Sequence, residues 1–182
     1  MRSLQLREED KRAQFEQAVL PHLDAAYNLA RWLARNDHDA EDVVQEAYLR
    51  AYQFFGGFRG VDGRAWLLTI VRNTCYTWLD RNRARQPATP FDEDKHSDAR
   101  PAANPESLLL QSEDRQLLRQ ALEELTPEYR EVIVLRELEG LSYKQIAAIA
   151  GIPLGTVMSR LARARERLEQ YAAGHLEQGT VT

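Results

Sequence analysis

Apolar residues recur at intervals of three and four along most of the chain, and strand-like alternation is absent. Before residue 86 this spacing predicts three amphipathic helices, at PHLDAAYNLARWLAR (21–35), DAEDVVQEAYLRAYQFF (39–55) and RAWLLTIVRNTCYTWLDRNRAR (64–85). Three helices of this kind can enclose a small core. The predicted fold class is therefore all-α.

Helical spacing returns at 105–125, and the residues that follow carry start and stop signals for further helices. Thr126 followed by Pro127 is a good N-cap with proline at the first helical position, and Gly140 is a good place for that helix to end. Ser142, with Gln145 three residues later, forms a capping box that begins another helix. The second half of the chain is thus also predicted to be helical.

The last of these helices belongs to the pattern of a helix-turn-helix. A short helix at 143–150, a tight turn at Gly151 and a longer helix from about Pro153 have the lengths of that motif, whose second helix can enter the DNA major groove.

On a helical wheel the second helix has two distinct faces. Its buried stripe is predicted to contain Val157, Leu161, Ala164 and Leu168. The opposite face and its shoulders carry small residues and arginines, at Gly155, Met158, Ser159, Arg160, Ala162, Arg163, Arg165, Glu166 and Arg167. Small residues allow close approach to base edges while arginines hold phosphates. A solvated amphipathic helix with ion pairs would give the same pattern, so the motif alone leaves both interpretations open.

Between the two helical regions lies QPATPFDEDKHSDARPAANPE (86–106), which is rich in Pro, Ala and Asp and has no sustained apolar period. Such a composition is typical of a flexible linker. The predicted organisation is therefore two small helical domains at 12–85 and 107–173, joined by a flexible acidic linker at 86–106.

Charge is unevenly distributed between the helices of the first domain. Residues 36–50 contain five acids and one arginine, and Leu49 falls among acids and amides on the outer face of the helix. The inner face is predicted to contain Ala40, Val43, Val44, Ala47, Ala51, Phe54 and Phe55. An apolar anchor ringed by polar groups is typical of a protein-docking helix. A leucine partly covered by a neighbouring helix is an equally good interpretation.

The helix at 64–85 has the opposite charge and an outer face with aromatic residues. Leu67, Leu68, Val71, Cys75, Trp78 and Leu79 form its predicted buried side, which leaves Trp66, Asn73 and Tyr76 outward beside Arg72. Rings interleaved with arginines suit unstacked bases, and the preceding loop GGFRGVDGR (56–64) presents Phe58 beside Arg59. For Trp66 and Tyr76, packing against another helix is the alternative. Cys75 is expected to be a small buried hydrophobic residue.

Composition excludes several classes of protein. The formal net charge is −4 over 182 residues, with one cysteine and four scattered histidines, so we expect no disulfide, no metal site and no cofactor. The charged N-terminus and the lack of a long apolar run predict a cytoplasmic protein that does not insert into membranes. No nucleophile–base pair or phosphate-binding loop is visible, so we do not expect an enzyme.

Three ordered segments together resemble the extracytoplasmic-function (ECF) group of bacterial RNA polymerase sigma factors, in the sigma-70 family. They are DAEDVVQEAYLRAYQFF, FRGVDGRAWLLTIVRNTCYTWLDRNR and LEELTPEYREVIVLRELEGLSYKQIAAIAGIPLGTVMSRLARARERL. The resemblance covers about Phe15 to Leu168 apart from the linker. It implies a non-enzymatic, alternative-type factor that binds core polymerase, directs it to specific promoters and assists promoter opening.

The resemblance also implies roles for particular residues. Contact with the β′ clamp helices of core polymerase would fall to Asp39, Glu41, Asp42, Gln45, Glu46 and Leu49. Recognition and melting of the minus-ten element would fall to Phe58, Arg59, Trp66, Arg72, Asn73 and Tyr76. The second domain would bind the β flap and read the minus-thirty-five duplex through Thr156, Met158, Ser159, Arg160, Ala162, Arg163 and Arg167.

Two positions depart from the family pattern. Met158 stands where many relatives have a basic residue, and Ala162 where a larger side chain often sits, so the preferred promoter sequence does not follow from the resemblance. An anti-sigma factor is an expected partner, since family members are commonly held inactive by one. The alternatives are a stand-alone helix-turn-helix regulator and a sigma-mimicking protein that sequesters an anti-sigma factor.

Overall fold

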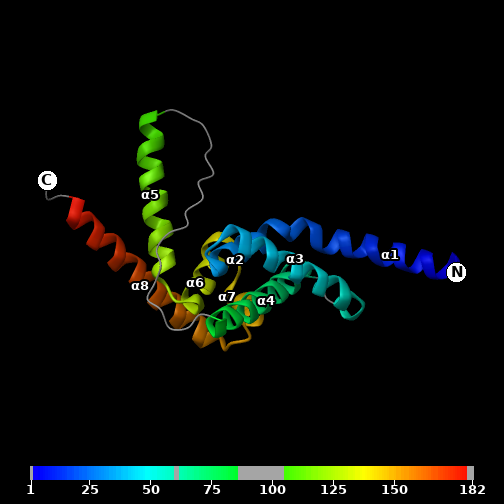
Figure 1. Ribbon diagram of the computed structural model, residues 1–182. Helices are drawn as coiled ribbons and strands as arrows, with labels where there is room; N and C mark the ends of the chain where they lie inside the picture. The colour runs from blue at the N-terminus through cyan, green and yellow to red at the C-terminus, as the bar shows by residue number, and fades with distance from the viewer. Residues whose placement is uncertain (1, 60–61, 86–104, 180–182) are drawn as a thin grey trace.

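The computed structural model describes the backbone of residues 2–59, 62–85 and 105–179, and side chains within 9–59, 62–84 and 115–175. Throughout these residues the chain forms helices joined by short connections, with no strand (Figure 1). The all-α prediction is therefore confirmed. Most of the predicted linker lies outside the described residues.

The first domain is built from four α-helices and two short 3₁₀ turns. These are α1 (Arg2–Val19), η1 (Leu20–His22), α2 (Leu23–Ala34), α3 (Asp37–Phe54), η2 (Phe55–Gly57) and α4 (Gly63–Arg85). Asn36 caps α3 by accepting a hydrogen bond from the Asp39 backbone N–H at 3.1 Å. The buried side of α4 contains Leu67, Leu68, Val71 and Cys75 as predicted, whereas Trp78 and Leu79 are only half-buried.

Helix α1 completes this core, and the three predicted helices of this domain did not include it. Phe15 and Val19 are 1% and 0% exposed, and the Phe15 ring makes edge contacts with Tyr48, Tyr52 and Phe55 at centroid distances of 5.0–5.3 Å. Edge-to-face aromatic pairs contribute beyond their buried area. The N-terminal helix thus covers one end of α3.

The second domain contains α5 (Pro105–Glu124), α6 (Pro127–Ile133), the π-helical turn η3 (Val134–Leu138), α7 (Tyr143–Ala150) and α8 (Leu154–Gly179). The start of α6 at Pro127 is confirmed, but the Thr126 side chain makes no capping hydrogen bond. Gly140 ends η3 with φ at +66°, and the Leu141 N–H reaches the Leu135 carbonyl at 3.0 Å. This bond spans one residue more than the six-to-one bond of a Schellman ending, because it closes a π-helical turn.

The helix-turn-helix forms as the sequence predicts. Ser142 and Gln145 make a complete capping box at the start of α7, and Gly151 turns the chain with φ at +65°. The following helix α8 carries Val157, Leu161 and Ala164 on its buried side against α6.

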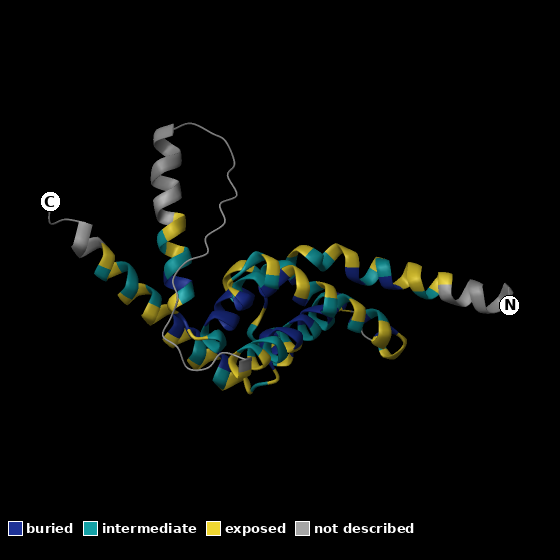
Figure 2. Ribbon diagram, viewed as in Figure 1, coloured by how far each residue is buried: buried dark blue, intermediate teal, exposed yellow. Residues whose placement is uncertain are grey.

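The two domains pack directly against each other, which no periodicity in the sequence predicts. Helix α4 lies along α7, and α2 lies against α6 and η3. Buried residues concentrate where these helices meet, while the ends of α1, α5 and α8 project away (Figures 1 and 2). Among the described residues no single helix has the length and apolar composition of a membrane span, and one bent pair, Tyr143–Ala150 with Leu154–His175 at 103°, meets those two criteria jointly.

Candidate polymerase and nucleic-acid interfaces

The outer face of α3 is acidic and open to solvent. Glu41, Asp42 and Gln45 are exposed, and Asp39 and Glu46 are half-buried at its edges. Glu46 pairs with Arg50 one turn later. Partial desolvation raises the pKa of Asp39, an effect that the charge of His38 opposes.

Leu49 stands on this acidic face with 62% of its surface exposed, which confirms the predicted orientation. Phe54, by contrast, was expected on the buried face and is 66% exposed. The expectation was wrong because α3 ends at Phe54 and the chain continues as the 3₁₀ turn η2, so the wheel of a regular α-helix no longer applies. Phe55 takes the buried place instead.

An aromatic cluster forms at the end of this turn. Phe58 stacks on Phe55 with centroids 5.6 Å apart and contacts Trp66 at 4.8 Å. Phe58 and Trp66 are half-buried, so each keeps part of its ring accessible, and Arg59 beside them is exposed. The structure thus brings together three of the six residues predicted for the minus-ten element.

The other three lie further along α4. The Arg72 guanidinium stacks 4.3 Å above the Tyr76 ring and donates from Nη1 to the Asn73 side chain at 3.2 Å. Arg72 Nε also donates to Glu131 Oε1 at 2.5 Å, and Tyr76 Oη donates to Glu131 Oε2 at 3.0 Å. Tyr76 therefore packs against another helix, α6, which is the alternative that the sequence left open for this residue.

Glu131 is fully buried, and burial dominates its electrostatics. Desolvation raises the pKa of its carboxyl, while the hydrogen bonds from Arg72 and Tyr76 and the charge of Arg160 act in the opposite direction. Burial and the adjacent Glu131 carboxylate likewise raise the pKa of Tyr76, so its hydroxyl stays protonated and remains a donor.

The outward face of α8 is formed as predicted. Ser159, Ala162 and Arg163 are exposed at its centre, with Met158 53% exposed on one side. Thr156 and Arg160 are half-buried, and the exposed Arg167 lies 4.8 Å above the Tyr129 ring. All seven predicted minus-thirty-five residues therefore lie on this helix without contributing to the buried stripe.

Comparison with known proteins identifies both helical domains. Sigma-70 region 2 matches residues 18–85, and sigma-70 region 4 matches residues 115–168. The chain is 40% identical over 138 residues to the ECF RNA polymerase sigma-E factor of Escherichia coli, covering 72% of each protein. The chain belongs to the ECF RNA polymerase sigma factors. It is an alternative sigma factor acting in transcription initiation, and not an enzyme.

Further relatives agree. The sigma factor SigE of Mycolicibacterium smegmatis is 38% identical over 162 residues, of whose length this chain spans 62%. Among solved structures, the sigma factor RpoE in complex with the anti-sigma factor NepR, from Bartonella quintana, is 32% identical with a TM-score of 0.72, covering 88% of this chain and 97% of that one. CnrH in complex with the cytosolic domain of CnrY is 27% identical with a TM-score of 0.62, covering 90% of each chain.

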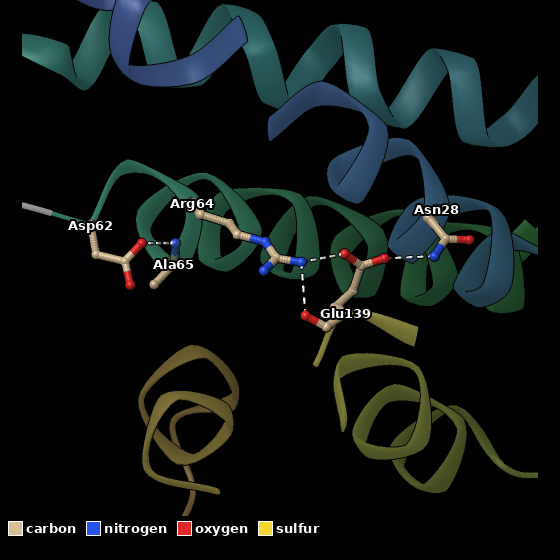
Figure 3. A network of polar contacts seen from close by, with 5 residues as sticks. All are labelled: Asn28, Asp62, Arg64, Ala65 and Glu139. Atoms are coloured by element: carbon tan, nitrogen blue, oxygen red, sulfur yellow. Dashed lines mark hydrogen bonds and ion pairs between the residues drawn. The ribbon is translucent and has the colours of Figure 1, made fainter. Parts of the chain in front are cut away.

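Two buried charged side chains of this sigma factor were not predicted from the sequence. The first is Glu139, whose side chain is 8% exposed. Its carboxylate accepts from Arg64 Nη2 and from Asn28 Nδ2, each at 2.6 Å, and Arg64 also reaches the Glu139 carbonyl at 2.9 Å (Figure 3). One acidic residue of the second domain thereby holds α2 and α4 of the first.

The second is Arg130, which is 1% exposed. Its guanidinium donates to the carbonyls of Leu122, Glu123 and Leu125 at 2.6–2.8 Å, where α5 ends, and to the Trp32 carbonyl in α2 at 3.0 Å. These are the carbonyls that a helix C-terminus leaves without partners. Burial lowers the pKa of Arg130 to about 10, so the group remains charged at neutral pH.

Proposed function

We propose that the sigma factor divides its work among three surfaces: the acidic face of α3, the aromatic and basic face that runs from η2 along α4, and the outward face of α8. In this proposal the first surface binds core polymerase. The second meets the melted minus-ten strand, and the third reads the minus-thirty-five duplex. The proposed domain limits are 12–85 and 107–173, with a linker at 86–106.

The observation that carries the proposal is the division of α8 into two faces. Val157, Leu161 and Ala164 are at most 1% exposed, while Ser159, Ala162 and Arg163 face solvent. Small side chains let the helix backbone approach the floor of the major groove, and arginines form bidentate contacts with guanine or grip phosphates. The same helix is the second helix of a helix-turn-helix, the element that enters the groove in that motif.

The minus-ten assignment is supported by the pair Phe58 and Trp66. Each ring is half-buried by the other and by Phe55, which fixes its orientation while part of its surface stays accessible. Fixed rings stack on extruded bases at small entropic cost, and the exposed Arg59 is placed to hold the backbone.

The polymerase assignment is supported by Leu49. It is a large exposed apolar side chain that follows Asp42, Gln45 and Glu46 by one to two turns of the same helix, and apolar anchors beside polar groups are typical of binding hot spots. In the family, the corresponding acidic helix binds the β′ clamp helices, and the second domain binds the β flap.

We also propose that this chain acts in the cytoplasm and has an anti-sigma factor as a partner. The support is that two structural neighbours, RpoE with NepR and CnrH with the cytosolic domain of CnrY, are complexes of this kind. The cytoplasm is where this chain would meet core polymerase.

Promoter-dependent transcription tests the proposed function directly. Purified bacterial core polymerase is incubated with and without the protein on a library of templates, and transcript starts are sequenced. We expect specific starts only with the protein, and their loss in Asp42→Arg and in Arg163→Ala. Absence of core binding and of initiation, together with duplex binding by the protein alone, would instead identify a stand-alone regulator.

A further inference from the structure

An open pocket lies beside the Phe58 ring, between helix α1 and the turn η2. Its volume is about 470 Å³, within the range of about 300–1,000 Å³ that is usual for pockets holding small organic molecules. Its lining includes Asp10, Lys11 and Gln14 of α1, Phe55 and Gly56 of η2, and Phe58 directly after η2. Aromatic rings on one wall and hydrogen-bonding side chains on the other are the features by which proteins hold a base outside its stack.

The α1 wall of this pocket is held in place by buried contacts. Phe15 of α1 is 1% exposed, and its ring lies 5.3 Å from that of Phe55. The start of α4 also touches the end of α1, because a Cβ at Gly63 would lie only 2.3 Å from the Ala18 carbonyl oxygen. The wall is therefore positioned before a ligand arrives, which lowers the cost of ordering it on binding.

Three polar side chains of α1 face this space. The Lys11 ammonium lies 4.8 Å from the centre of the Tyr52 ring, a cation–π contact that gives the side chain a defined direction. An ammonium has three N–H donors, so this contact leaves donors for a nucleic acid. Asp10 and Gln14 are exposed. The wall thus offers a cationic donor, an anionic acceptor and an amide that both donates and accepts.

The carboxylate of Asp10 restricts which base suits the pocket. Phosphates repel a carboxylate, so Asp10 favours binding only where a base donates hydrogen bonds to it. The Watson–Crick edge of guanine carries two adjacent donors, N1–H and the N2 amino group, next to the acceptor O6. Asp10 can accept from both donors while Lys11 donates to O6. Thymine turns two carbonyl oxygens toward the same wall and is disfavoured.

We propose that this pocket takes a second unstacked base of the nontemplate strand, adjacent to the base on the Phe58 and Trp66 rings, and that Asp10 and Lys11 select guanine there. Phe58 links the two positions, since its ring contacts Trp66 and also lines the pocket. The inference rests on the proposed function, because it takes Phe58 and Trp66 as minus-ten residues. It extends the DNA-reading surface to α1, which lies outside the residues assigned above.

Two neighbouring glycines allow the pocket to be filled with a matched control. Gly56 and Gly57 are both exposed, and neither has an atom within 4 Å of the place where a Cβ would lie. Of the two, Gly56 lines the pocket. Gly56→Leu therefore fills the space at little cost to the fold, and Gly57→Leu adds the same side chain outside it. Equal affinities of both variants for core polymerase check that the fold persists.

Binding is measured with holoenzyme assembled from bacterial core polymerase and the full chain. The probe is the fluorescent single-stranded nontemplate minus-ten segment of a promoter selected in the transcription experiment, with each base replaced in turn by an abasic site. We expect two adjacent positions at which loss of the base weakens binding about fivefold or more. Gly56→Leu should remove the dependence on one of them and weaken binding of the intact segment about tenfold. Gly57→Leu should keep both dependences.

Two failures are distinguishable in this experiment. If Gly56→Leu and Gly57→Leu show the same dependence at every position while Phe58→Ala removes one, the pocket proposal is overturned and the minus-ten site stands. If no position depends on its base, or Phe58→Ala changes none, the proposed minus-ten site fails and the pocket proposal fails with it.

The choice of guanine is tested by removing one donor from the base. Selected promoters should carry guanine at the pocket position, and replacing it with inosine, which lacks the 2-amino group, should weaken binding about tenfold. Asp10→Asn should reduce this ratio to about twofold or less. Glu9→Gln, which removes the same charge from the adjacent exposed residue, should keep it. Another base at this position, or equal ratios in the two variants, overturns the selection by Asp10.

Discussion

The rings of Phe58 and Trp66 lie in tilted contact, with centroids 4.8 Å apart, at the junction of η2 and α4. Phe55 supports both rings from the core, since it is 9% exposed and stacks on Phe58. Although Phe58 lies in a loop, its ring is thereby held in a fixed orientation, like that of a residue in a helix. This geometry allows a nearby base to stack without first ordering the loop.

Phe58→Ala should therefore weaken binding of the single-stranded minus-ten segment by about 1–3 kcal/mol, the usual loss for one base–aromatic stack. Binding of the minus-thirty-five duplex should not change. Phe54→Ala is the matched control, since Phe54 is four residues earlier and 66% exposed but lies outside the proposed site. Fluorescence anisotropy of labelled oligonucleotides measures both affinities, and equal losses in the two variants would contradict the assignment.

Leu49→Ala should weaken binding to core polymerase while leaving the stability of the fold nearly unchanged. Because Leu49 is 62% exposed, its truncation should change the free energy of unfolding by no more than about 0.5 kcal/mol. If it is the anchor of the polymerase surface, affinity for core should fall by about 2 kcal/mol or more. Leu20→Ala, at a residue 45% exposed, is the control, and titration of labelled protein with core polymerase is the measurement. Equal affinities for core in the two variants would remove Leu49 from the interface.

Local features of the chain were predictable, and the reason lies in short-range geometry. The Ser142–Gln145 capping box, the turn at Gly151 and the two faces of α8 depend on residues three or four positions apart, which periodicity and capping rules describe. The same rules placed Phe54 on the buried face, which was wrong because the helix tightens into a 3₁₀ turn directly after this residue.

The contacts between domains could not be predicted in this way. Arg72 and Glu131 are 59 positions apart, and Asn28 and Glu139 are 111 apart. A buried carboxylate and an exposed one look alike in a helical sequence, because the partner that makes burial tolerable comes from a distant helix. For the same reason nothing in the sequence distinguishes the buried Arg130 from a surface arginine.

Arg130→Leu should be strongly destabilising. Its guanidinium is the donor for carbonyls at the ends of two helices, and its removal leaves these acceptors buried without partners at about 1–3 kcal/mol each. We expect a loss of about 3 kcal/mol or more in the free energy of unfolding, measured by urea titration with circular dichroism. Arg115→Leu, at an exposed position of α5, should change it by no more than about 0.5 kcal/mol. Similar midpoints for the two variants would show that Arg130 is dispensable.

Arg167→Ala should weaken duplex binding without changing sequence preference. Arg167 lies at the edge of the outward face of α8, 4.8 Å above the Tyr129 ring, and from this edge we expect it to reach a phosphate rather than a base. Loss of one phosphate contact lowers the slope of log affinity against log salt by about 1. Arg163→Ala, at the centre of the face, should relax the preference as well. Binding to selected and scrambled duplexes across a salt series distinguishes the two, and an altered preference in Arg167→Ala would place that residue against a base.

Alkylation of Cys75 should show an abnormal pH dependence. Burial raises the pKa of its thiol from 9.0 to about 12, and the nearby Glu131 carboxylate adds to the rise. Since only the thiolate reacts, the reactive fraction at pH 8 falls from about one in ten to about one in ten thousand. The rate should keep increasing about tenfold per pH unit between pH 7 and pH 10, whereas an exposed Gln53→Cys thiol should level off near its ordinary pKa. Iodoacetamide labelling followed by mass spectrometry gives both profiles, and a plateau near pH 9 for Cys75 with the helices intact would mean that the thiol is reached by solvent.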